Sequence, residues 1–131
     1  MKLLLDTQTW VWSALEPGRI NPRTAETLVD SQNELWLSPI SVWEVLLLAR
    51  KKRIVLEPDA QTAVRQWLRD RPLREAVMTR EIAMVSEAIE LSNQDPADRF
   101  LAATAKVLGL TLVTSDRHLL ACRDISTLSA S

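Results

Sequence analysis

The sequence has little of the chemistry that marks a secreted protein or a zinc protein. Its 131 residues include one cysteine and one histidine. A single cysteine excludes an internal disulfide, and the two counts together exclude a zinc cluster built on Cys and His ligands. This composition fits a reducing compartment, so we expect a cytoplasmic protein.

Long apolar runs are also absent. The apolar residues 3–5 are followed by Asp6, long before the core of a signal peptide is complete. The apolar residues 45–49 are followed by the basic residues 50–53, and no stretch approaches the roughly 18 apolar residues of a membrane span. We therefore expect no export and no membrane partner.

The charge balance gives no sign of a cationic surface over the whole molecule. Sixteen basic and seventeen acidic residues leave a formal net charge of −1. Any binding of a nucleic acid must then be local or depend on a metal ion. With 47% apolar residues, the chain is long enough for one core and too short for two ordinary domains, so residues 1–131 are expected to form a single domain.

Short apolar runs alternate with segments of helical periodicity, which indicates an α/β sandwich. Pro22 and Pro96 favour first helical turns, and Gly109 favours a helix end. The apolar runs predict strands at residues 2–6, 35–38 and 110–114, with weaker ones at 76–79 and 125–128. The periodic segments predict helices at 9–15, 22–31, 39–52, 60–71, 81–91 and 96–108.

Four acidic residues stand where these elements meet. Asp6 ends the first expected strand, and Asp116 follows the strand at 110–114. Glu44 lies in the helix after the second strand, and Asp98 lies in the first turn of a later helix. Ligands of an open parallel sheet bind beyond the carboxyl ends of its strands, so these four side chains are expected to share one pocket.

Glu44 is the most informative of the four acids. Its helical neighbours Ile40, Leu47 and Leu48 place the carboxylate on an apolar face. Burying an unpaired charge there costs several kcal/mol. Glu44 therefore belongs either to a functional site or to a buried salt bridge with an arginine such as Arg99.

Helix capping is the alternative role for the other polar residues. Asp6 can cap the helix that follows it, and Asp95 is the natural cap of the helix that begins at Pro96. Asp98 then either stabilises the positive helix end or projects over the sheet edge. Ser115 is expected to cap a short helix, whereas Thr114 either does the same or lies in the site.

Four carboxylates in one pocket require a cation. They repel one another and raise each other's pKa values, and a divalent ion removes that repulsion. Oxygen ligands suit Mg²⁺, with Mn²⁺ as the second choice, whereas zinc prefers His and Cys. Such an ion activates water for attack on a phosphodiester. Asp6 and Asp116 are the expected direct ligands, with Glu44 and Asp98 binding the ion or orienting its waters.

The remaining distinctive residues say less about function. His118 is expected on the exposed side of its helix, outside the site. Trp67 lies among arginines that can form a small patch facing RNA or a partner, although a solvated amphipathic helix explains it equally well. For the tryptophans as a group, core packing is a better explanation than base stacking; they are Trp10, Trp12, Trp36, Trp43 and Trp67.

Four motifs, in this order, resemble the PIN-domain family, in particular its VapC-type toxins. They are LLLDT at 3–7, SPISVWE at 38–44, DPADRFLAATA at 95–105 and LVTSD at 112–116. The resemblance implies a three-layer α/β/α sandwich with a mainly parallel sheet, metal-dependent endoribonuclease activity, a cognate antitoxin and commonly a homodimer. It carries the family's acidic quartet onto Asp6, Glu44, Asp98 and Asp116, and the auxiliary hydroxyl onto Thr114.

Two departures from the closest subgroup lie beside the expected site. Gln8 stands where a histidine often follows the Asp-Thr pair, and Asn93 and Gln94 replace a frequent histidine and arginine. These changes leave the four acids intact and concern how the RNA is handled. The RNA that is cleaved can be transfer RNA, ribosomal RNA or another RNA.

Other functions fit the residues less well. A phosphatase of the haloacid dehalogenase type needs a second aspartate two residues after the first, where this chain has Gln8. A receiver-like phosphorylation module needs clustered acids after the first strand and a lysine near the last, and both are missing. The alternative to an enzyme is a PIN-like module that binds RNA or a partner without cleaving it.

Overall fold

Five parallel strands form the centre of the fold. In the computed structural model, which describes residues 1–131, the strand order is β3-β2-β1-β4-β5, and every neighbouring pair is parallel. The strands are β1 (Lys2–Leu5), β2 (Glu34–Leu37), β3 (Arg74–Glu75), β4 (Thr111–Thr114) and β5 (Ser126–Ser129). The α/β class and the mainly parallel sheet are thus confirmed.

The prediction of a strand at residues 76–79 is wrong. Pairing on that edge involves Arg74–Glu75 instead, with Glu75 opposite Leu37, the last residue of β2. The backbone N–H of Ala76 still donates to the Leu37 carbonyl at 2.9 Å. After Leu37 the chain leaves the sheet and continues as a helix from Pro39. Residues 77–79 therefore have no neighbouring strand to pair with.

Seven α-helices and one 3₁₀ helix connect the strands. Three helices begin with a proline at their first position, as the sequence predicts, and Gly109 ends a helix with a left-handed φ of 66°. The α-helices are α1 (Thr7–Leu15), α2 (Pro22–Val29), α3 (Pro39–Arg50), α4 (Ala60–Asp70), α5 (Arg80–Ala88), α6 (Pro96–Leu108) and α7 (Arg117–Leu120), with the 3₁₀ helix at Pro17–Arg19. None is long and apolar enough to cross a membrane.

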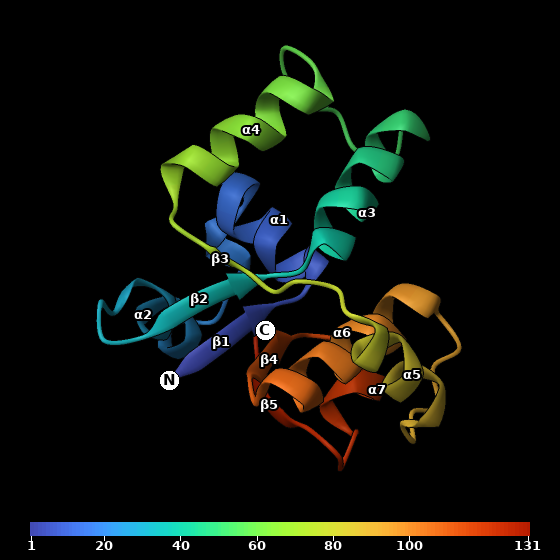
Figure 1. Cartoon of the computed structure of the whole chain (residues 1–131). Helices are drawn as coiled ribbons and strands as arrows, with labels where there is room; N and C mark the ends of the chain where they lie inside the picture. The colour runs from blue at the N-terminus through green and yellow to red at the C-terminus, as the bar shows by residue number, and fades with distance from the viewer.

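The helices cover both faces of the sheet, which gives the three layers expected of the fold (Figure 1). Residues from α1 to α4 pack with Leu3 and Leu5 in one core cluster, whereas residues of α6 and α7 pack with Leu4 in the other. Successive side chains of a strand point to opposite faces. This explains why three apolar residues, Leu3 to Leu5, follow one another in β1.

Candidate active site

All four expected acids line one pocket at the carboxyl ends of β1 and β4. The pocket has a volume of about 280 Å³. It is smaller than an apolar groove of about 670 Å³ elsewhere on the molecule, which contains no acidic side chain. The pocket is lined by Asp6, Thr7, Gln8, Glu44, Leu48, Asp98, Ser115 and Asp116.

Asp6 caps a helix and also lines the acidic pocket. Its Oδ1 accepts from the backbone N–H of Thr9 at 2.8 Å, which caps α1. Its Oδ2 accepts from the hydroxyl of Thr114 at 2.5 Å. Asp6 is only 6% exposed. The capping hydrogen bond therefore holds the carboxylate within the pocket, so the two roles are compatible.

Glu44 reaches the pocket from α3 and is held by a hydroxyl. Thr7 Oγ1 donates to Glu44 Oε1, and the same Thr7 oxygen lies 3.0 Å from the Ser41 hydroxyl oxygen. Thr7 and Ser41 are buried. The half-buried glutamate is therefore anchored by an uncharged neighbour.

The hypothesis of a buried salt bridge between Glu44 and Arg99 is wrong. Arg99 Nε donates to the carbonyl of Ser86 at 2.9 Å, Nη2 donates to Ile89 at 2.9 Å, and Nη1 donates to Leu91 at 3.1 Å. These carbonyls belong to the end of α5 and the loop after it, where a cation is favoured by the helix dipole. Arg99 is a structural residue that leaves the acids without a guanidinium partner.

Asp98 and Asp116 are also held by neutral donors. The side-chain amide of Asn93 donates to Asp98 Oδ2. Asp116 Oδ1 accepts from the backbone N–H groups of His118 at 2.8 Å and Leu119 at 3.1 Å. Asp116 is therefore itself the N-cap of α7.

This arrangement corrects the role expected for Ser115. The helix begins one residue later than a serine cap requires, so Ser115 makes no capping hydrogen bond and lines the pocket instead. The other expected cap is confirmed, since Asp95 accepts from the N–H of Ala97 at 2.9 Å. Asp98 therefore does not cap α6.

Thr114 links two of the acids. It is fully buried at the end of β4. Its hydroxyl donates to Asp6 Oδ2 and accepts from the backbone N–H of Asp116 at 3.0 Å. One side chain thus fixes the position of Asp6 relative to the start of the Asp116 loop.

The acids make the pocket electrostatically unfavourable when it contains no cation. Burial, reinforced by the neighbouring carboxylates, raises the pKa of Asp98 to about 7. Burial also raises the pKa values of Asp6 and Glu44, although hydrogen bonds from Thr114 and Thr7 oppose the increase. None of the four acids takes part in a salt bridge with Lys, Arg or His.

The set of donors fits a hard divalent cation that keeps part of its water shell. No three Asp, Glu, His or Cys side chains lie close enough to hold one ion together. Mg²⁺ retains several waters and needs only one or two carboxylates from the protein, whereas a structural zinc site needs four close ligands. The Thr114 hydroxyl connects Asp6 to the backbone of Asp116, and Glu44 and Asp98 line the same pocket.

Two residues that position the acids were not identified from the sequence. From the sequence, Thr7 stands out only as part of the first motif, and Asn93 only as a departure from a family pattern. Their contacts with Glu44 and Asp98 depend on how loops fold back onto helices. For Thr7, the signal available was its place directly after Asp6 in a motif.

The histidine lies outside the pocket, as expected. His118 is exposed, and its Nδ1 is 2.8 Å from the hydroxyl oxygen of Ser92. Trp67 packs edge-to-face against Trp10, with ring centroids 5.3 Å apart, so its ring contributes to packing. Trp43 contradicts the expectation of core packing, because it is 55% exposed and lines the apolar groove.

The family model described as PIN domain matches residues 3–123. The chain belongs to the PIN-domain family. Ribonuclease VapC22 of Mycobacterium tuberculosis (strain ATCC 25618 / H37Rv) is 34% identical over 120 residues, which are 89% of this chain and 88% of that protein. The expected resemblance to VapC-type PIN-domain proteins is confirmed.

Solved structures of VapBC complexes contain chains of the same fold. VapBC2 from Rickettsia felis, bound to a DNA fragment from the promoter, has a TM-score of 0.76 at 15% identity over 100% of both chains. DNA-bound VapBC from Salmonella typhimurium has a TM-score of 0.75 at 19% identity, covering 100% of this chain and 99% of that one. At these identities the structures support the three-layer fold and nothing finer.

Proposed function

We propose that this PIN-domain chain is an endoribonuclease that depends on Mg²⁺ or Mn²⁺. The observation that supports the proposal best is the way the four acids are held. Each accepts hydrogen bonds from hydroxyl, amide or backbone donors, and none is neutralised by a basic side chain. RNA is proposed as the substrate because the relative at 34% identity is a ribonuclease.

Each acid has its own task in this mechanism. Asp6 and Asp116 bind the cation, and Thr114 keeps them in register. Glu44, fixed by Thr7, and Asp98, fixed by Asn93, orient the attacking water and the leaving oxygen. The cation, when bound, polarises the phosphoryl group and lowers the pKa of a coordinated water. In this mechanism water attacks the phosphodiester, and no side chain acts as a covalent nucleophile.

Cleavage of RNA by the purified protein is expected to depend on a divalent cation. A fluorescent single-stranded RNA is incubated with the protein in Mg²⁺, in Mn²⁺ and in EDTA, and fragments are separated by gel. We expect cleavage with either metal, none in EDTA, and recovery when Mg²⁺ is restored. Cleavage that continues in EDTA contradicts the metal mechanism. RNA binding without cleavage, with the protein folded and the metal present, favours the non-catalytic module.

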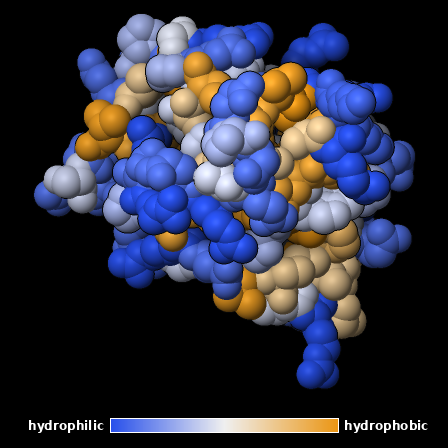
Figure 2. All heavy atoms as spheres, turned by 90° about the horizontal axis from the view of Figure 1, so that it is seen from above, coloured by the Kyte–Doolittle hydropathy of each residue, from blue (hydrophilic) through white to orange (hydrophobic).

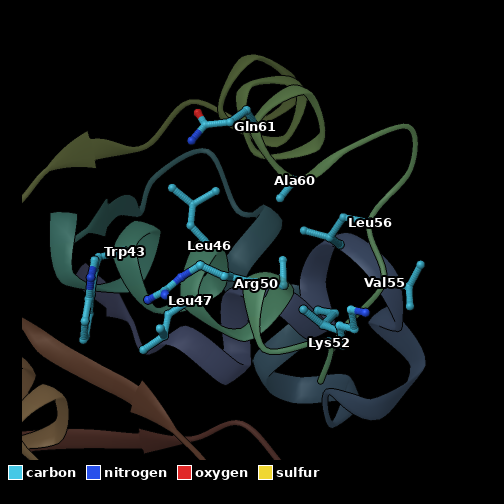
Figure 3. A pocket seen from close by; sticks show the side chains of 11 residues that line it. Trp43, Leu46, Leu47, Arg50, Lys52, Val55, Leu56, Ala60 and Gln61 are labelled. Carbon is cyan, nitrogen blue, oxygen red and sulfur yellow. The ribbon is translucent and has the colours of Figure 1, made fainter.

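We also propose that the chain is the toxin of a toxin-antitoxin pair and that its antitoxin docks in the apolar groove. The groove lies between the second half of α3 and the start of α4, with Leu46, Leu47 and Leu56 in its lining (Figure 3). Arg50 and Lys52 also line it. On the surface seen from above, hydrophobic residues are exposed between hydrophilic ones (Figure 2).

The groove chemistry fits an amphipathic segment of the antitoxin. An apolar face fills such a groove, and carboxylates at its edge pair with the basic side chains. The segment we propose is therefore apolar on one side and acidic at its border. A homodimer, which the family resemblance implies, stays a prediction to be measured by light scattering.

Val55→Glu is expected to weaken antitoxin binding at least about 10-fold, since it places a carboxylate in an apolar interface. Val55 lines the groove and is 76% exposed, so the fold tolerates the change. Val29→Glu is the matched control, because Val29 is 70% exposed and outside the groove. The toxin role predicts a small reading frame upstream of the gene, and its product is the binding partner in the assay. Equal affinities for the two variants would remove the groove from the proposal.

A further inference from the structure

Asn93 forms hydrogen bonds through its side-chain oxygen, its side-chain nitrogen and its own carbonyl. Its Oδ1 accepts from the backbone N–H of Asp95 at 2.8 Å, and its Nδ2 donates to Asp98 Oδ2. Its own carbonyl accepts from Arg99 Nη1 at 3.4 Å. The side chain therefore connects the loop that precedes α6 with a carboxylate in the first turn of that helix.

The loop that carries Asn93 is itself fastened. Arg99 donates to carbonyls on the end of α5 and along the loop, including those of Ile89 and Leu91. A planar guanidinium with several donors holds such carbonyls in fixed directions. Since Arg99 lies one residue after Asp98 on α6, the same helix turn fixes both the acid and the residue that contacts it.

The contact also determines which oxygen of Asp98 is available. Oδ2 is occupied by the Asn93 amide, while Oδ1 has no hydrogen-bond partner within the chain. Asp98 lines the acidic pocket together with Asp6, Glu44 and Asp116. An acid that must orient a water needs one oxygen aimed at the site and little freedom of rotation.

We propose that Asn93 is a positioning residue that locks the Asp98 carboxylate with Oδ1 toward the cation pocket. This inference rests on the proposed nuclease function and extends it to a residue at which the chain departs from its closest subgroup. The competing explanation is that Asn93 only shapes the turn through its contact with Asp95. The two explanations depend on different halves of the side-chain amide. The positioning role needs the Nδ2 donor to Asp98, whereas the turn needs only the Oδ1 acceptor for Asp95.

Asn93→Asp separates the halves, because it has the same shape, keeps the acceptor for Asp95 N–H and removes the donor to Asp98. Asn93→Ser likewise keeps an acceptor for the turn and cannot reach Asp98. Gln94→Glu is the matched control, since it adds the same charge one residue away at an exposed position. The four proteins are compared by thermal melting, by Mn²⁺ affinity from electron paramagnetic resonance, and by kcat and KM on a fluorescent RNA.

For both Asn93 variants we expect kcat or Mn²⁺ affinity to fall by roughly 10- to 100-fold, the range typical of residues that orient metal ligands. KM for RNA and the melting temperature should change little, and Gln94→Glu should behave like the parent. Unchanged kcat and Mn²⁺ affinity in both variants would overturn the inference, as would a fall in melting temperature with normal activity of the folded fraction.

Crystal structures of the parent and Asn93→Ser provide a readout that needs neither cleavage nor metal. We expect the Asp98 side chain to rotate or become disordered in the variant. An unchanged, well-ordered Asp98 would also overturn the inference. If the parent cleaves no RNA, the nuclease proposal fails, while the orientation of Asp98 still tests the role of Asn93.

Discussion

Asp6→Asn is expected to lower RNA cleavage at saturating Mg²⁺ by at least about 100-fold, which corresponds to about 2.7 kcal/mol of lost transition-state stabilisation. The change removes a negative charge from the floor of the pocket and little else. Asparagine is as good a helix cap as aspartate, so its Oδ1 can still accept from the N–H of Thr9. Its amide can also still form a hydrogen bond with the hydroxyl of Thr114.

The measurement is single-turnover cleavage, with circular dichroism to verify the fold. Asp59→Asn is the matched control, because Asp59 caps α4 by accepting from the N–H of Thr62 at 2.9 Å and lies outside the acidic pocket. It should cleave at the parental rate. If the Asp6 variant retains more than a tenth of the activity, its carboxylate is not a ligand that the reaction needs.

Asp98→Asn is expected to make the metal-free protein more stable at neutral and alkaline pH while it impairs cleavage. The pKa of Asp98 is raised from 3.8 to about 7 in the folded chain, mainly by burial and then by neighbouring carboxylates. A carboxyl with a raised folded pKa stabilises the fold fully below its unfolded pKa, and that contribution is lost as the pH rises through the folded value. The ionised group therefore opposes folding above pH 7.

The variant avoids this effect, because an amide never ionises and its oxygen can still accept from Asn93. In EDTA at pH 8, we expect its melting temperature to exceed that of the parent by roughly 2–5 °C, a shift typical of about 1 kcal/mol in a chain of this size. The advantage should shrink at pH 5, where the parental carboxyl is protonated. Mg²⁺ should also reduce it, since the ion binds the folded parent. Identical melting curves at both pH values would contradict the pKa shift.

The sequence predicted the position of the acids well because topology alone brings them together. Once β1 and β4 are parallel neighbours, Asp6 and the loop with Asp116 must lie at the same sheet edge. The apolar neighbours of Glu44 were also enough to place it on an inward face of α3. Such inferences need only the periodicity of each segment and the rule that parallel strands end at the same sheet edge.

The contacts that hold the acids could not be predicted in the same way. Thr7 and Thr114 each have one hydroxyl proton. Which neighbouring oxygen accepts it depends on the exact positions of side chains in the folded protein, and the sequence pattern does not give those positions. The expected salt bridge of Arg99 failed for a related reason, because backbone carbonyls at the end of α5 competed successfully for its donors. The error over Ser115 was a shift of one residue, which decides which side chain caps α7.

The alternating leucines of β1 have a consequence for how this strand can change over time. Leu3 and Leu5 belong to one layer interface and Leu4 to the other, and the next position is Asp6. Exchanging one leucine for another apolar residue alters a single contact. Inserting or deleting one residue between the leucines and Asp6 makes each leucine point to the opposite face of the sheet, relative to the Asp6 side chain. The strand therefore tolerates a change of residue far better than a change of length.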